Sequence, residues 1–162
     1  MLKHKYYNFC NGFRKLQRKK FYISVIYYNR LASRVKYSKG DIKIKTIFIA
    51  EDDRDLQRLY ELLLEMSGFK VLGIANNGEE AIKMFRSFPE KPDIIILDYR
   101  MPIKNGLDAL KEILHIDHNS SIIFASADKT IKEEVYSHGA KGFLDKPFTH
   151  KKLLSLLNDI LM

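Results

Sequence analysis

The sequence is poor in cysteine, and this scarcity excludes two kinds of covalent or metal stabilisation. Cys10 is the single cysteine among the 162 residues, so an internal disulfide cannot form. No Cys/His spacing resembles a zinc site, because His115 and His118 have no cysteine or third ligand nearby and are typical of a polar helix end. Chains without a disulfide framework are typical of the cytosol, so we expect a cytoplasmic protein.

Long hydrophobic runs are also absent. The longest charge-free apolar run, Phe21–Tyr28, covers eight residues, whereas a membrane-spanning helix needs about 20. The same run makes a poor signal peptide, because its core is rich in tyrosine and no convincing small-residue cleavage site follows. No tandem repeat or low-complexity tract interrupts the regular part of the chain. These absences favour one globular domain with some additional chain.

Acidic residues are scarce in the first quarter of the chain. Residues 1–44 hold twelve Lys and Arg side chains and one acid, a net charge of +11, whereas residues 45–162 hold 16 bases and 19 acids, a net charge of −3. We interpret residues 1–43 as a basic, aromatic-rich extension that is poorly ordered or forms a lone amphipathic helix. One alternative is an arm that binds nucleic acid or an anionic membrane, although no helix-turn-helix pattern is visible. Another is translated upstream sequence, with the fold starting near Asp41 or Ile42.

From Ile42 onward, apolar runs and helical periodicity alternate regularly. The runs predict five strands, around residues 46–50, 71–75, 94–97, 121–125 and 141–145. Helices are predicted after each strand, over residues 56–67, 79–87, 105–114, 130–138 (with Thr130 as its cap) and 149–161. Such alternation predicts an α/β fold with a parallel sheet that is covered on both faces.

Polar side chains follow four of the five predicted strands. They are Glu51 and Asp52, Asp98, Ser126 and Lys146. The carboxyl ends of parallel strands meet at one edge of a sheet, so these groups should converge. Carboxylates that lie together repel each other unless a cation is present, and few carboxylates beside a phosphate suit Mg²⁺. Asp98 ends the most apolar strand and is the best candidate for a nucleophile toward phosphorus, with Lys146 as a positive charge for phosphoryl oxygens.

Residues 44–162 resemble the receiver domain of two-component response regulators. The segments that carry the resemblance are Ile49-Ala50-Glu51-Asp52-Asp53, Leu97-Asp98-Tyr99-Arg100-Met101-Pro102 with Asn105-Gly106, Ala125-Ser126-Ala127, and Gly142-Phe143-Leu144-Asp145-Lys146-Pro147-Phe148. The resemblance implies a flavodoxin-like, doubly wound sheet of five parallel strands in the order 2-1-3-4-5, with five helices.

The resemblance also implies a role for each residue of the site. Asp98 would be the phosphoacceptor, and Lys146 and Ser126 would contact the phosphoryl group. Ser126 and Phe143 would be the switch residues, and the alternative for Phe143 is a fixed core aromatic ring. A cis peptide bond is expected before Pro147. The implied Mg²⁺ ligands are Glu51, Asp52, Asp98 and the backbone carbonyl of Arg100, whereas Asp53 is predicted to be a helix N-terminal residue.

The function implied by the resemblance is signalling rather than enzymatic turnover. A histidine kinase or histidine phosphotransfer protein would phosphorylate Asp98, and Mg²⁺-dependent self-phosphorylation and self-dephosphorylation would be the only chemistry. As a single-domain response regulator, the chain would signal through protein contacts on the face made by the fourth helix, fifth strand and fifth helix. Nucleic acid and membrane are not the expected partners. A haloacid dehalogenase-type hydrolase is rejected because its nucleophile ends the first strand, whereas Asp98 ends the third. A pseudo-receiver is disfavoured because no phosphorylation residue is missing.

Arg100 and Asp128 suggest a feature specific to this sequence. Each lies two residues after a predicted site residue, Asp98 and Ser126 respectively. We hypothesise that the two side chains pair across the mouth of the site and hinder attacking water, which would make the phosphorylated state long-lived. The alternative is that both side chains are simply solvated.

Overall fold

Five parallel strands form the centre of the structure, a computed structural model in which residues 43–162 are described. The strands are β1 (Thr46–Ala50), β2 (Lys70–Ala75), β3 (Ile94–Asp98), β4 (Ile122–Ser126) and β5 (Gly142–Asp145). They pair in the order β2-β1-β3-β4-β5, which confirms the predicted fold class and strand order. The predicted extension of residues 1–43 lies, except for Lys43, outside the described residues.

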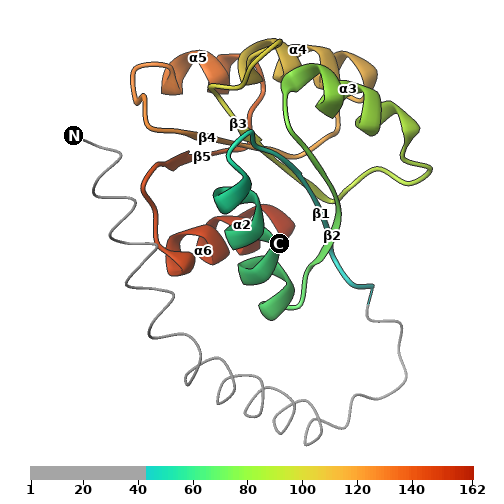
Figure 1. The fold of residues 1–162 in the computed structure, drawn as a ribbon, viewed down its shortest axis with the longest axis vertical. Helices are drawn as coiled ribbons and strands as arrows, with labels where there is room; N and C mark the ends of the chain where they lie inside the picture. Colours follow the sequence, from blue (N-terminus) through green and yellow to red (C-terminus); the bar gives the residue numbers. More distant parts are fainter. Residues whose placement is uncertain (1–42) are drawn as a thin grey trace, which may run out of the picture. The chain divides into compact units, whose positions relative to one another are not determined.

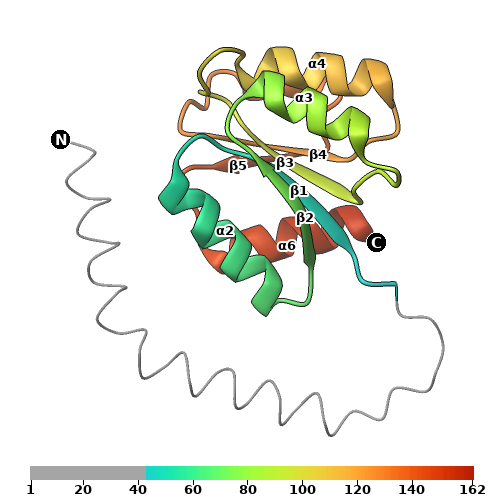
Figure 2. The same cartoon turned by 45° about the vertical axis from the view of Figure 1, so that its right-hand side comes forward.

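Within residues 43–162, five helices cover the two faces of this sheet. They are α2 (Arg54–Met66), α3 (Gly78–Ser87), α4 (Gly106–Ile116), α5 (Lys132–Ser137) and α6 (His150–Leu161). Helices α2 and α6 lie on one face, and α3, α4 and α5 lie on the other (Figures 1 and 2). None of the helices between residues 43 and 162 combines the length and the apolar character that crossing a bilayer would require.

Side chains alternate between two cores along the central strands. On β1, Phe48 packs with the α3–α4–α5 side, whereas its neighbours Ile47 and Ile49 pack with the α2–α6 side. All five residues of β3 and all five of β4 are buried. Burial on both faces explains why these strands are continuous apolar runs rather than alternating ones.

Capping residues fix where most of the helices begin. The side chains of Asp53, Asn77, Asn105 and Thr149 each accept a backbone N–H from the first turn of α2, α3, α4 and α6 respectively. These contacts satisfy amide groups that have no partner inside the helix. The Asp53 contacts agree with its prediction as a helix N-terminal residue.

The predicted cap of the fourth helix is wrong. Helix α5 begins at Lys132 after Ile131, without a side-chain cap. Thr130 instead binds the Asp128 carboxylate, to which it donates its backbone N–H (3.0 Å) and its hydroxyl (2.6 Å). Asp128 therefore holds Thr130 in a turn before the helix, and α5 is correspondingly short.

Candidate functional site

The register of the sheet brings the predicted residues to one edge. Ala50 lies beside Leu97, so the residues that follow them, Glu51 and Asp98, are at the same level. Ser126 likewise lies beside Asp145, the residue before Lys146. The sheet therefore delivers the polar groups of β1, β3, β4 and β5 to its C-terminal edge, as the sequence predicted.

Lys146 is the positive centre of this group. Its Nζ donates to Glu51 Oε2 at 2.6 Å and also to Asp98 Oδ1 in a short ion pair. All three side chains are largely removed from water. The backbone N–H of Lys146 is fixed by Ser126 O at 2.8 Å, which ties β5 to the end of β4. The peptide bond between Lys146 and Pro147 is cis, as predicted.

Charge in the site is only partly compensated. Burial raises the pKa of Glu51 to about 7, an effect that the Asp98 carboxylate adds to and that Lys146 opposes. Burial also raises the pKa of Asp52, with a smaller contribution from Asp98. For Lys146, burial lowers the pKa, but the Asp98 and Glu51 carboxylates outweigh it, so the net pKa lies above its ordinary value. Without a bound cation, Glu51 therefore holds a proton more readily than an ordinary glutamate does.

The acidic residues present a donor set that fits a divalent cation. One carboxylate oxygen from each of Glu51, Asp52 and Asp98 lies within 4.8 Å of the others. Three carboxylates and the single ammonium group of Lys146 leave two formal negative charges. A hard cation with oxygen ligands, such as Mg²⁺, matches this charge and these donors. Asp53 is engaged at the N-terminus of α2, where Asp55 N–H and Leu56 N–H donate to its Oδ1 at 2.8 and 3.1 Å.

Ser126 and Asp128 connect the site to its outer rim. The buried Ser126 hydroxyl accepts the backbone N–H of Asp128 at 2.9 Å. The Asp128 carboxylate lies 3.4 Å from the Arg100 guanidinium, so the predicted pairing of these two side chains is confirmed. Hydrogen bonds from Thr130 and then the Arg100 charge hold the pKa of Asp128 below its ordinary value. The role of the Arg100 carbonyl as a metal ligand stays a prediction.

Phe143 lies inside the core. Its side chain is 7% exposed, and its ring stacks on Phe124 with centroids 6.4 Å apart. This burial matches the alternative reading, a fixed core aromatic ring. The switch role of Phe143 stays a prediction.

Two residues that support the site were missed in the sequence. A Cβ atom on Gly106 would overlap the Asp98 carbonyl oxygen, so only glycine lets the start of α4 approach the strand that carries Asp98. Gln57 on α2 donates its side-chain N–H to the Glu51 carbonyl at 2.6 Å and to Asn76 Oδ1 at 3.0 Å. A signal for Gly106 was present, since Asn105-Gly106 marked the start of the helix, but the contact itself depends on tertiary structure.

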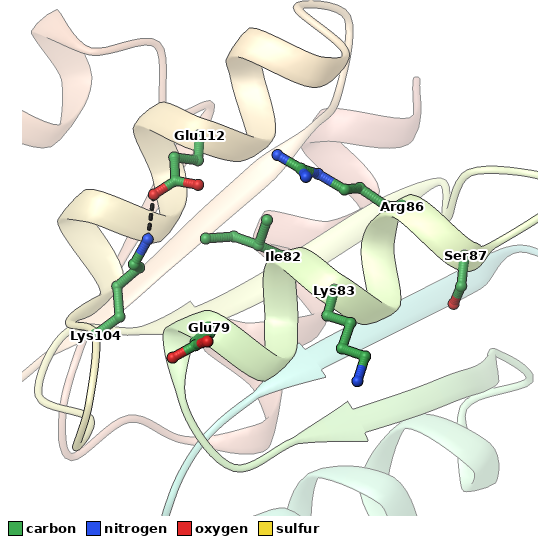
Figure 3. Close-up of a pocket in the computed structure, with 7 residues that line it drawn as sticks. All are labelled: Glu79, Ile82, Lys83, Arg86, Ser87, Lys104 and Glu112. Atoms are coloured by element: carbon green, nitrogen blue, oxygen red, sulfur yellow. Dashed lines mark hydrogen bonds and ion pairs between the residues drawn. The ribbon is translucent and has the colours of Figure 1, made fainter.

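An open hollow of mixed charge lies between α3 and α4. Lys104 forms a short ion pair with Glu112 across one end of it (Figure 3). The lining is completed by Glu79, Ile82, Lys83, Arg86 and Ser87. None of the predicted site residues lines this hollow. The hollow is therefore a different surface from the one that carries the acidic cluster.

A comparison with protein families and a comparison with individual proteins agree on the kind of protein that this chain resembles. A family model described as the response regulator receiver domain matches residues 47–158. The chemotaxis protein CheY of Thermotoga maritima is 36% identical over 118 residues, which cover 72% of this chain and 97% of CheY. The transcriptional regulatory protein CpxR of Klebsiella pneumoniae is 37% identical over 120 residues, which cover 71% of this chain and 48% of CpxR. The chain thus matches nearly all of one relative and about half of the other.

Solved structures show the same fold. The crystal structure of the CheX–CheY–BeF3–Mg²⁺ complex from Borrelia burgdorferi contains a chain with a TM-score of 0.71 and 26% sequence identity. The match covers 73% of this chain and 90% of that one.

Proposed function

The chain belongs to the response regulator receiver domain family of two-component signalling, and on this basis we propose that Asp98 accepts a phosphoryl group from a phosphohistidine protein. Members of this family are signalling switches rather than conventional enzymes. The observation that carries the proposal is the convergence of Asp98, Glu51 and Lys146 at one sheet edge, joined by the contacts of the lysine.

The reaction is a direct displacement at phosphorus. A carboxylate oxygen of Asp98 forms the new P–O bond while the bond between phosphorus and the donor histidine nitrogen breaks. The electron pair of the broken bond stays on that nitrogen, and the ring leaves as neutral imidazole because it carries one proton on its other nitrogen or takes one from water. Lys146 Nζ, held beside Asp98, stabilises the negative charge on the transferred group.

Three carboxylates are well placed to hold Mg²⁺ for this step. They are those of Glu51, Asp52 and Asp98, and the proposed set is completed by the Arg100 carbonyl. When bound, Mg²⁺ would supply neutralisation of phosphoryl charge and would favour the ionised forms of Glu51 and Asp52. The Borrelia complex, which contains Mg²⁺ and BeF3, supports this assignment by similarity.

The output of the switch is proposed to be a protein contact. Phosphorylation adds a charge of about −1.5 to −2 beside Lys146 and Ser126. Movement of Ser126 toward this charge, with Phe143 responding, would change the surface of α5, β5 and α6, where a target protein would bind. We propose the cytoplasm as the compartment, because the single Cys10 gives no disulfide framework. The alternative, an output through the basic arm, concerns residues outside the described part of the chain.

Labelling by a small phosphodonor tests the proposal directly. The full-length chain is incubated with acetyl phosphate and Mg²⁺, and its intact mass is measured. Asp98→Asn, which keeps the size of the side chain, is expected to abolish the addition of one phosphoryl group. Asp53→Asn is the matched control, because asparagine also caps a helix, and it should label like the wild type. Labelling that survives in Asp98→Asn would contradict the assignment.

A further inference from the structure

Ile103, in the loop between β3 and α4, combines an unusual backbone with an exposed apolar side chain. Its φ angle is 67°, in the left-handed region that β-branched residues rarely adopt. Lys104 N–H donates to Pro102 O at 2.7 Å across it, which makes a γ-turn of the strained, positive-φ kind. The side chain is 79% exposed. A strained backbone at an exposed side chain is typical of a functional site and is not explained by packing in the core.

Contacts on both sides of Ile103 hold the turn in place. Gly78 N–H donates to Lys104 O at 3.0 Å, and Gly106 N–H donates to Tyr99 O at 2.9 Å. The Lys104 side chain is held by Glu112, as Figure 3 shows. These contacts involve the neighbours of Ile103 and not its side chain, so a glycine would fit the same turn without strain. The isoleucine side chain therefore contributes little to packing within residues 43–162.

The position of Ile103 relative to Asp98 indicates what could contact it. Gly106 abuts the Asp98 carbonyl, and three Cα–Cα steps from Gly106 to Ile103 span at most about 11 Å. A donor protein must bring its phosphohistidine to roughly 3–3.5 Å from the Asp98 carboxylate. A standard protein interface covers about 800 Å² per partner, equivalent to a disc of about 16 Å radius. The two lengths are of the same order, so a donor centred on Asp98 would reach the turn that carries Ile103.

We propose that Ile103 is a specificity-determining contact for the phosphodonor protein, seated in an apolar pocket beside the donor's phosphohistidine. This inference rests on the proposed function, because it assumes that Asp98 is phosphorylated by a protein. The target-binding surface proposed above lies on α5, β5 and α6, whereas the Ile103 turn is anchored to the starts of α3 and α4. The position of the Ile103 turn therefore favours the phosphodonor protein, and not the target protein, as the partner that contacts Ile103.

The experiment compares a protein donor with a small donor on the full-length chain. The small donor is acetyl phosphate with Mg²⁺, which needs no protein surface. The protein donor is the autophosphorylated histidine kinase of the host, alone or acting through a histidine phosphotransfer protein, that labels the wild type fastest. The variants are Ile103→Gly, Ile103→Leu, and Ile44→Gly as the matched control. Ile44 is an isoleucine with 59% exposure just before β1, at the opposite edge of the sheet.

Ile103→Gly is expected to lower kcat/KM for the kinase about ten- to hundredfold, the effect of losing one buried isoleucine contact, mainly through KM. Its labelling by acetyl phosphate and its melting temperature should not fall. Ile103→Leu should restore kinase transfer, and Ile44→Gly should resemble the wild type with both donors.

Wild-type kinase transfer in Ile103→Gly would overturn the inference, and it would leave target binding as the remaining use of this side chain. Labelling of the wild type by acetyl phosphate but by no histidine kinase or histidine phosphotransfer protein of the host would overturn it too. Failure of both acetyl phosphate and every protein donor to label the wild type would instead refute the proposed function, so the two failures are distinguishable.

Discussion

Replacing Glu51 by glutamine should remove a pH dependence of stability that the wild-type chain carries without Mg²⁺. Glu51 is 2% exposed, and its burial raises its pKa from the ordinary value of 4.5 to about 7. Lys146 lowers this pKa and Asp98 raises it, but both effects are smaller than that of burial. The folded state therefore binds this proton more tightly than the unfolded state. The stability that the proton contributes is complete below the unfolded pKa and is lost as the pH rises through the folded pKa.

The size of the effect follows from the two pKa values. A difference of about 2.5 units, taken from the values of 4.5 and about 7, corresponds to about 3 kcal/mol in the free energy of unfolding. Most of it, on the order of 2 kcal/mol, is lost between about pH 5 and about pH 8. Glutamine does not titrate, and its carbonyl oxygen can still accept the hydrogen bond from Lys146, so the variant should lack this component.

Urea unfolding in the presence of a chelator measures the difference. Wild type and Glu51→Gln are compared across the pH range, and the change in their free-energy difference isolates Glu51 from other titrating groups. Glu65→Gln, at an exposed position in the last turn of α2, is the matched control and should follow the wild type. Saturating Mg²⁺ should reverse the wild-type trend, because it favours the ionised carboxylate. Identical pH dependence of wild type and Glu51→Gln under chelation would refute the reasoning.

Two further predictions concern the rim of the site and the support beneath Asp98. The double variant Arg100→Ala, Asp128→Ala should lose its phosphoryl group faster than the wild type after acetyl phosphate is removed, since the 3.4 Å ion pair no longer hinders water. The pair Asp55→Ala, Arg58→Ala on α2 is the control, and equal or slower decay in the Arg100, Asp128 variant would contradict the hypothesis. Gly106→Ala should reduce the free energy of unfolding by about 3 kcal/mol, because its Cβ meets backbone at Asp98 that cannot move aside. Gly73→Ala should cost clearly less, because its Cβ meets the flexible end of Met84 at 2.7 Å, and similar urea midpoints for the two variants would show that the backbone contact is unimportant.

The sequence predicted the fold and the converging residues because both depend on local patterns. Ile94 to Leu97 are apolar without interruption, which requires burial on both faces, and Asp98 follows them directly. In a parallel sheet, neighbouring strands end at the same edge, so the position of Glu51 beside Asp98 follows from where their two strands end. The ion pair of Arg100 with Asp128 could be anticipated in the same way, from equal distances along the chain to two neighbouring strand ends.

Features that depend on tertiary contacts could not be predicted from local sequence patterns. Thr130 has the residue type of a helix cap, but Asp128 competes for its N–H and hydroxyl, and α5 begins later. Isoleucine has no local preference for a positive φ. The turn at Ile103 is imposed by backbone hydrogen bonds on both sides of it, those of Lys104 with Pro102 and Gly78 and that of Gly106 with Tyr99. The closeness of Gly106 to Asp98 likewise depends on how α4 packs on β3.

If Ser126 acts as proposed, its hydrogen bond from Asp128 N–H influences the balance between the resting and the active arrangement of the chain. Moving Ser126 toward a phosphoryl group requires this bond to break, at a net cost of about 1 kcal/mol. In the proposed switch, the bond would therefore favour the inactive arrangement of the unphosphorylated chain about fivefold. Basal signalling without a phosphodonor would thus be set partly by one backbone amide, two residues beyond the hydroxyl that it restrains.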